Sequence, residues 1–155
     1  RVFTLAGLKP QIEEYHQAWK DAGHEGRGKV GLRIPVYLSK DPQKAHDEPM
    51  ESAMFSMGRL SDRVASYAEY GGTTGNWGQE AETVKNMSYD DWVRDKVAFG
   101  TPEAVTGKLQ DLSEHLGLDQ IMFEVDYGNK IPLENQLNSL RLMMEKVAPN
   151  LGCAP

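Results

Sequence analysis

The sequence predicts an α/β fold in which three parallel β-strands and their helices form part of a (β/α)8 barrel. Strand-like and helix-like segments alternate along the 155 residues, which implies parallel strands joined by helical crossovers. The strands carry polar residues on one face and apolar residues on the other, which suits a barrel wall better than a sheet covered on both faces. Three strands are too few to close a barrel, so we expect an incomplete barrel with two open edges.

The first predicted strand covers residues 1–6, an apolar and β-prone run with no polar lead-in. The chain opens on Arg1 rather than Met, and a trimmed or processed chain is one interpretation. We favour the other, in which the sequence starts inside a buried strand and the barrel is cut. The run does not read as a signal peptide, because no apolar core followed by a small-residue cleavage site is present. A helix is predicted next, from about Pro10 to Gly23.

The second predicted strand covers residues 30–38, where apolar residues occupy every even position. A longer helix is predicted from about Pro49, with an apolar stripe from Met50 to Val64 that is rich in methionine. We interpret this stripe as adaptable core packing rather than as a cofactor site.

Residues 70–95 are predicted to form a glycine-rich insert. Its first part, residues 70–78, has four glycines in nine residues, which disfavours stable helix or strand. A weak, polar helix is predicted around residues 79–95. The glycines do not form a phosphate-binding P-loop, because the Gly-Lys-Ser/Thr element is absent.

The last part of the chain carries the clearest helix signals. Thr101-Pro102-Glu103 combines a good N-cap, a first-turn proline and an acidic side chain at the positive end of the helix dipole. Gly117 ends this helix. The third strand is predicted over residues 120–126, and the final helix runs from Pro132 to Pro149.

On a barrel wall, one face of each strand points inward. The alternation predicts that Arg33, Tyr37, Glu124 and Asp126 point inward. Arg33 and Glu124 could then neutralise one another, because an unpaired buried charge is costly.

Composition and motifs exclude several functional classes. The chain has 23 acidic and 17 basic side chains, and its net charge of −6 argues against non-specific nucleic-acid binding. No apolar run approaches the ~20 residues of a membrane span. The four histidines lack metal-ligand spacing, and neither a Gly-x-Ser-x-Gly elbow nor a general base stands out. The single cysteine, Cys153, agrees with a reducing, cytoplasmic location.

Five segments together carry a resemblance to a known family. Residues 97–105 match a Gly-Thr-Pro-Glu-x-Val segment, residues 116–121 match a Leu-Gly-Val-Asp approach to a last strand, and residues 138–149 match a closing helix. Residues 15–23 and 34–39 also fit. In this order the segments resemble the luciferase-like flavin-dependent monooxygenases, the bacterial luciferase-like family. The resemblance covers most of the chain except the glycine-rich insert.

The resemblance implies that the chain is the C-terminal portion of a TIM-type barrel and supplies its strands six, seven and eight. It implies FMN as the cofactor, with the deazaflavin F420 as the less favoured one. Reduced FMN, which a separate reductase could supply, would react with oxygen to give a peroxyflavin that oxygenates a small organic substrate. The protein would orient the cofactor and exclude water.

Barrel enzymes place their sites at the carboxyl ends of the strands. Two structural interpretations stay open beside the functional one: Tyr37 as an inner-wall filler, and Asp126 as the cap of the following turn. Catalytic residues are not identified. Cofactor contacts are predicted at Gly7, Tyr37, Ser39, Asp126, Tyr127, Gly128 and Asn129.

Members of this family often carry a mobile lid where the glycine-rich insert lies. Tyr70, Gly71, Gly72 and Trp77 would form such a lid and shield the flavin from water. An exposed connection is an equally good interpretation.

In this family, much of the flavin contact comes from earlier strands. We therefore expect this chain alone to bind flavin weakly or not at all and to be inactive. The expected partners are an organic substrate, oxygen, the missing N-terminal half of the barrel, and further copies in a homo-oligomer. Two alternatives stay open: an F420-dependent oxidoreductase of the same fold, and a non-catalytic module that self-associates through its exposed edges.

Overall fold

The computed structural model describes residues 4–70 and 82–152, which are arranged around a three-stranded parallel sheet. The predicted α/β class with three parallel strands is confirmed. The elements follow the order η1 (Ala6–Leu8), α1 (Lys9–Asp21), β1 (Gly31–Leu38), α2 (Pro42–Asp47), α3 (Met50–Tyr70), α5 (Tyr89–Asp95), β2 (Ala98–Gly100), α6 (Pro102–Leu116), β3 (Gln120–Glu124), α7 (Leu133–Leu142), η2 (Met143–Val147) and η3 (Ala148–Leu151).

The strand order is β2-β1-β3, with β1 in the centre. Residues 36–38 of β1 pair with β2, and residues 31–35 pair with β3. The outer edges of β2 and β3 have no strand partner within residues 4–70 and 82–152, so the sheet is open. The order departs from that of a closed barrel, in which strands consecutive in the chain are neighbours, because β3 pairs with β1 instead of β2.

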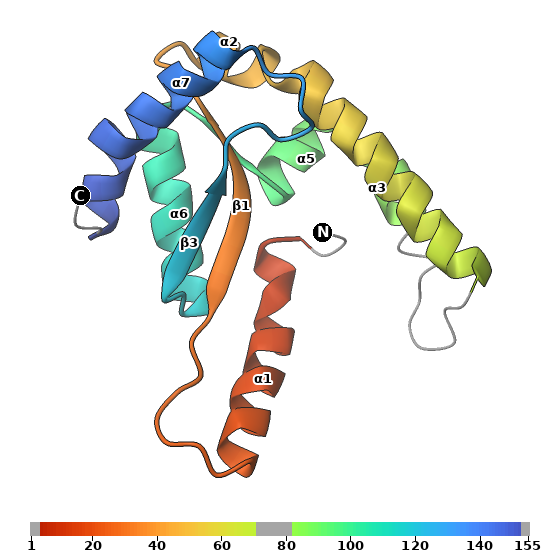
Figure 1. The fold of residues 1–155 in the computed structure, drawn as a ribbon, viewed down its shortest axis with the longest axis vertical. Helices are drawn as coiled ribbons and strands as arrows, with labels where there is room; N and C mark the ends of the chain where they lie inside the picture. Colours follow the sequence, from red (N-terminus) through yellow and green to blue (C-terminus); the bar gives the residue numbers. More distant parts are fainter. Residues whose placement is uncertain (1–3, 71–81, 153–155) are drawn as a thin grey trace.

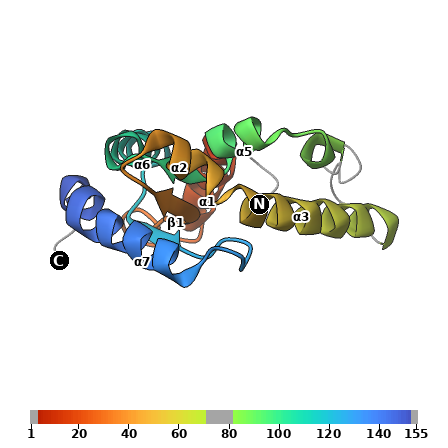
Figure 2. The same ribbon diagram turned by 90° about the horizontal axis from the view of Figure 1, so that it is seen from above.

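The even-numbered side chains of β1 build the larger core. Leu32, Ile34, Val36 and Leu38 are all buried and pack against α6 and the end of the chain. Figures 1 and 2 show α6 and α7 together on this side of β1. Each such buried side chain contributes roughly 1.5–3 kcal/mol, so the predicted alternation is both confirmed and a main source of stability.

The odd-numbered side chains of β1 face α3 and α5, which lie on the other side of the strand (Figure 1). Tyr37, near the carboxyl end of β1, packs there with Met57, Trp92 and Phe99. Arg33 lies on the same face nearer the start of the strand. Polarity is therefore divided between the two faces of β1 as the sequence predicts.

The helix signals around α6 are confirmed in detail. The Thr101 hydroxyl accepts a hydrogen bond from the Ala104 N–H at 3.3 Å, and Pro102 occupies the first helical position. Gly117 ends the helix with φ 64°, a left-handed conformation that favours glycine.

The predicted strand over residues 1–6 is wrong where the structure describes it. Thr4 has no regular structure, and Leu5 lies in a bend that leads into η1. Leu5 is nevertheless buried in the larger core. Its apolar character therefore reflects burial and not strand formation. The third strand is instead β2, which at three residues is too short to show alternation.

The apolar stripe predicted on the last helix lies on the surface along most of its length. Leu133, Leu137 and Met144 are 67%, 52% and 50% exposed, and Leu140 is also exposed. On the neighbouring strand β3, Met122 is exposed as well.

Candidate functional site

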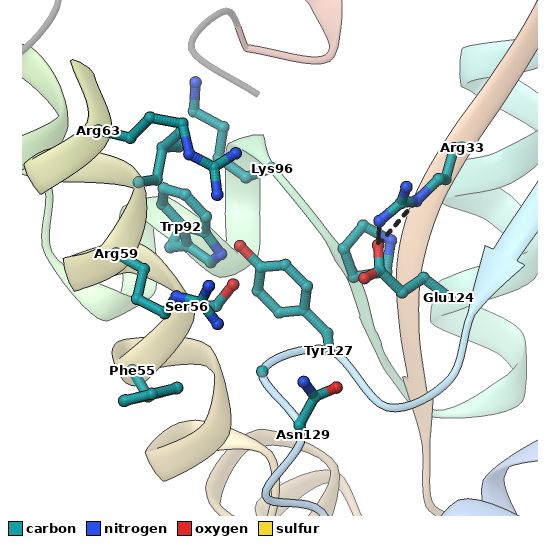
Figure 3. A pocket seen from close by; sticks show the side chains of 13 residues that line it. Arg33, Phe55, Ser56, Arg59, Arg63, Trp92, Lys96, Glu124, Tyr127 and Asn129 are labelled. Atoms are coloured by element: carbon teal, nitrogen blue, oxygen red, sulfur yellow. Dashed lines mark hydrogen bonds and ion pairs between the residues drawn. The ribbon is translucent and has the colours of Figure 1, made fainter.

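A groove of about 510 Å³ lies between the sheet and α3, on the side of β1 that faces away from α6 (Figure 3). This volume falls within the ~300–1,000 Å³ typical of ligand sites. We call it the α3 groove. Its walls come from β1, α3, α5 and the loop after β3, and its main side chains are Arg33, Ser56, Arg59, Arg63, Trp92, Glu124 and Tyr127.

An ion pair between Arg33 and Glu124 forms one wall of the groove. Two guanidinium nitrogens of Arg33 lie 2.9 and 3.1 Å from one carboxylate oxygen of Glu124. The pairing follows from the register, since Arg33 lies opposite Met122 and Glu124 is the next residue on the same face of β3. The predicted pairing of these two residues is confirmed.

The loop after β3 is held against α3 by one buried serine. The Ser52 hydroxyl donates to the Tyr127 carbonyl oxygen at 2.6 Å and accepts from the Lys130 N–H at 3.0 Å. Between these two contacts, Gly128 and Asn129 adopt positive φ values of 95° and 60°. The loop therefore has a defined shape, and it places the Tyr127 ring over the groove.

The Tyr127 ring stacks on Trp92 from α5, with ring centroids 6.4 Å apart and planes inclined by 20°. Helix α5 is fixed by a capping box in which Ser88 and Asp91 satisfy each other's backbone N–H groups. Trp92 is 2% exposed, and its indole Nε1 finds no hydrogen-bond acceptor among the described residues. A buried donor without a partner is costly, and the Nε1 atom itself has almost no surface open to the groove.

Positive charge gathers in the groove although the chain as a whole is acidic. Arg59 and Arg63 from α3 and Lys96 after α5 line it beside Arg33, whereas Glu124 is the carboxylate among its lining residues. Figure 3 shows Arg59 and Arg63 extending from α3 toward Trp92, across the groove from Arg33 and Glu124. The local field therefore favours an anionic ligand.

The structure brings three of the predicted cofactor contacts into this groove: Tyr127, Gly128 and Asn129. Asp126 is adjacent, but its carboxylate accepts the Ile131 N–H at 3.3 Å and its carbonyl oxygen accepts the Asn129 N–H. Asp126 thus caps the following turn, which was the alternative interpretation of this residue.

Tyr37 and Ser39 lie outside the α3 groove and line a second cavity at the carboxyl end of β1. Tyr37 is 1% exposed, and its hydroxyl donates to the Glu48 carboxylate. Burial, followed by the nearby Glu48 carboxylate, raises the pKa of Tyr37 above its ordinary value. Tyr37 therefore fills the inner wall, which was the alternative interpretation of this residue. The Ser39 hydroxyl accepts a hydrogen bond from the Asp41 N–H at 3.2 Å.

The remaining predicted contacts are placed differently. Gly7 lies in η1 and donates its N–H to the Thr4 hydroxyl at 3.1 Å, so it does not follow a strand as expected. Tyr70 is the last residue of α3, not part of an irregular loop. The lid residues Gly71, Gly72 and Trp77 lie outside the described residues.

Sequence reasoning missed the residues of α3 and α5 that build the groove. Arg59 and Arg63 are four positions apart and share a helix face, which is a readable signal of paired cations. Trp92 stands in a polar segment that we predicted to be weakly helical. Only the folded chain brings these three residues beside the loop after β3.

Within the described part of the chain, no group of three or more His, Cys, Asp or Glu side chains could hold a metal ion. Among the same residues, no helix has both the length and the apolar character needed to cross a membrane.

Comparison of sequences finds no relative: no protein-family model and no curated protein matches this chain. Solved structures do match. The oxygenating constituent of 3,6-diketocamphane monooxygenase from the CAM plasmid of Pseudomonas putida, a type II Baeyer-Villiger monooxygenase in complex with FMN, is 23% identical with a TM-score of 0.64. The match covers 95% of this chain and 40% of that chain.

Two further structures share the fold. Monooxygenase RslO1 from Streptomyces bottropensis is 18% identical, with a TM-score of 0.62 over 95% of this chain and 39% of that chain. The coenzyme F420 dependent tetrahydromethanopterin reductase from Methanopyrus kandleri is also 18% identical, with a TM-score of 0.56 over 94% and 42%. At these identities the similarity concerns the fold, and this chain spans about two fifths of each neighbour. The neighbours have the luciferase-like barrel fold, so the fold of this chain is that of a partial barrel.

Proposed function

We propose that this chain is the C-terminal part of a luciferase-like oxidoreductase that uses reduced FMN and oxygen to oxygenate a small organic substrate. The α3 groove carries the proposal: a stacked Trp92–Tyr127 pair and several cations meet beside the carboxyl end of β3. Barrel enzymes place their sites at this end of the strands. An F420-dependent reductase of the same fold is the second candidate, favoured by one of the structural neighbours.

The groove residues fit a flavin-type cofactor by their chemistry. Tyr127, which is partly exposed and stacks on the buried Trp92, offers aromatic surface for a planar ring. Bound FMN would supply the redox chemistry, while Ser52 and α5 keep the two aromatic side chains in place.

The open flank of the chain supports the view that further barrel elements belong beside it. The outer edges of β2 and β3 are unpaired within residues 4–70 and 82–152, and Leu133, Leu137 and Met144 are exposed. Without those elements, the protein would contact a bound flavin from one side alone. We therefore expect this chain alone to bind flavin weakly or not at all and to be inactive. The same surfaces favour self-association, and sizing by light scattering of this chain tests that alternative.

The proposal is tested by expressing in full the reading frame that contains this sequence. We expect the purified protein to retain FMN, identified by its absorption spectrum and by the mass of the released cofactor. A protein that has the complete barrel and binds neither FMN nor F420 would contradict the proposal. Retention of F420 alone would select the second candidate.

Activity provides the second arm of this test. With reduced FMN and oxygen, the full protein should oxygenate one of a panel of aldehydes, ketones and sulfonates.

We also propose a cytoplasmic location, in agreement with the single cysteine.

A further inference from the structure

We propose that the α3 groove holds an oxyanion, and that Arg59 and Arg63 bind it. The ligand therefore carries a phosphate, sulfonate or carboxylate group. The inference names the chemical class of the ligand, and for the role of that ligand it rests on the proposed function. Its test, however, requires no redox chemistry.

Arg59 and Arg63 are the first support for the proposal. They lie one helical turn apart on α3, where like charges disfavour one another. Neither guanidinium makes an ion pair or a hydrogen bond with any described residue, and Arg59 has only a cation–π contact with Phe55, 5.9 Å from the ring centre. An anion between the two side chains would remove their repulsion and use their planar donor groups.

Trp92 forms part of the groove wall beside the two arginines. Its ring is 98% buried, yet its Nε1 donor finds no acceptor in the described part of the chain, and the ring lines the same groove. Figure 3 shows the indole between α3 and Tyr127, on the side of the groove where Arg59 and Arg63 end. Trp92 therefore belongs to the wall of the same groove, and its emission can report an anion that binds there.

The other cations of the groove are already engaged. Arg33 is neutralised by Glu124, and Lys96 is 4% exposed and makes contacts of its own. This leaves Arg59 and Arg63 as cations available to a ligand, in a groove that is open enough for a small anionic group to enter. The remainder of the ligand would then lie along Tyr127.

Binding of inorganic phosphate to the 155-residue chain tests the proposal. Trp19 and Trp77 are first replaced by Phe, so that Trp92 alone emits fluorescence. Phosphate is titrated at constant ionic strength against chloride, since salt screens exposed charges. We expect saturable binding, reported by a change in the emission of Trp92.

Substitutions at the groove show whether the fluorescence change reports binding at Arg59 and Arg63. Arg59→Gln and Arg63→Gln should each weaken phosphate binding about tenfold, as expected for one charge-assisted hydrogen bond. Arg141→Gln is the matched control, because Arg141 on α7 is exposed, has no ion pair within the described residues and lies outside the α3 groove.

The proposal is overturned if phosphate, sulfate and acetate all fail to bind at tens of millimolar. It is also overturned if the two groove arginine variants bind as tightly as Arg141→Gln does. Thermal unfolding of every variant checks that it is folded, and Arg59 and Arg63 are exposed positions at which substitution leaves the core intact.

Two ligand pairs then identify the source of the oxyanion. Displacement of phosphate by FMN but not by riboflavin assigns the site to a cofactor phosphate. Equal behaviour of FMN and riboflavin, together with binding of methanesulfonate or acetate, assigns it to an anionic substrate. Failure of the flavin test in the full protein, with anion binding intact, would count against the proposed function and leave this site standing.

Discussion

Ser52 of α3 and Gly128 of the loop after β3 lie in direct contact, and the backbone carbonyl of Ser52 fills the space where any side chain on Gly128 would begin. The same serine holds Tyr127 and Lys130 on either side of that glycine. One close approach between a helix and a loop therefore fixes the wall of the α3 groove. Its consequences can be measured.

Gly128→Ala should destabilise the chain strongly, because the added Cβ would overlap the Ser52 backbone and φ at this position is 95°. Gly152→Ala is the matched control, since φ there is 72° and no atom lies within 4 Å of an added Cβ. We expect Gly128→Ala to lower the free energy of unfolding by at least about 2 kcal/mol more than the control. Urea denaturation measures both, and equal losses would show that the contact with Ser52 does not matter.

Ser52→Ala should lower the free energy of unfolding by about 1–3 kcal/mol, because it leaves the Tyr127 carbonyl and the Lys130 N–H without their partner. Ser66→Ala, at an exposed position of the same helix, should be nearly neutral. Denaturant titration distinguishes the two variants. A neutral Ser52→Ala would mean that water replaces both hydrogen bonds.

The Arg33–Glu124 pair should contribute little to stability. Their side chains are 68% and 28% exposed, so a double-mutant cycle with Arg33→Gln and Glu124→Gln should give a coupling of roughly 0.2–1 kcal/mol that falls with added salt. The exchange Arg33→Glu with Glu124→Arg should fold better than either single reversal. If the exchange variant is no more stable than either single reversal, the ion pair does not contribute to the free energy of unfolding.

His46 should make stability depend on pH. Hydrogen bonds to Asp47 and then to Asp90 raise the pKa of His46 in the folded chain. Its stabilising effect is therefore complete below the unfolded value of about 6.5 and is lost as pH rises through the higher folded value. Unfolding curves across neutral pH should show this loss in the wild type and not in His46→Gln.

His24→Gln is the control for this prediction, because His24 contacts the Trp19 ring and forms no ion pair with a carboxylate of the described residues. It should keep the pH dependence of the wild type. An unchanged pH dependence in His46→Gln would show that the two aspartates do not hold the imidazolium.

The sequence predicts those parts of the fold that depend on local signals. The ends of α6 follow from Thr101 and Gly117, each of which acts on backbone groups within one helical turn. The buried face of β1 follows from its alternation, and the contact between Arg33 and Glu124 follows from that alternation on two strands.

The parts that could not be predicted depend on contacts between distant segments. Leu5 lies in the core without being in a strand, and β2 gains its strand conformation by pairing with β1. The α3 groove requires α3 and α5 to lie beside the loop after β3. The hydrophobic periodicity of the sequence does not indicate which distant segments become neighbours. Arg59, Arg63 and Trp92 were therefore identified only in the folded chain.

The sheet has a consequence for the time course of folding. Each residue of β1 that pairs with β3 has its partner about ninety residues later in the sequence. Arg33 and Glu124, for example, are 91 residues apart. Contacts of such long range slow the search for the native topology. During synthesis, β1 would therefore leave the ribosome long before its neighbour exists, and it would stay exposed to non-native association until the last quarter of the chain has been made.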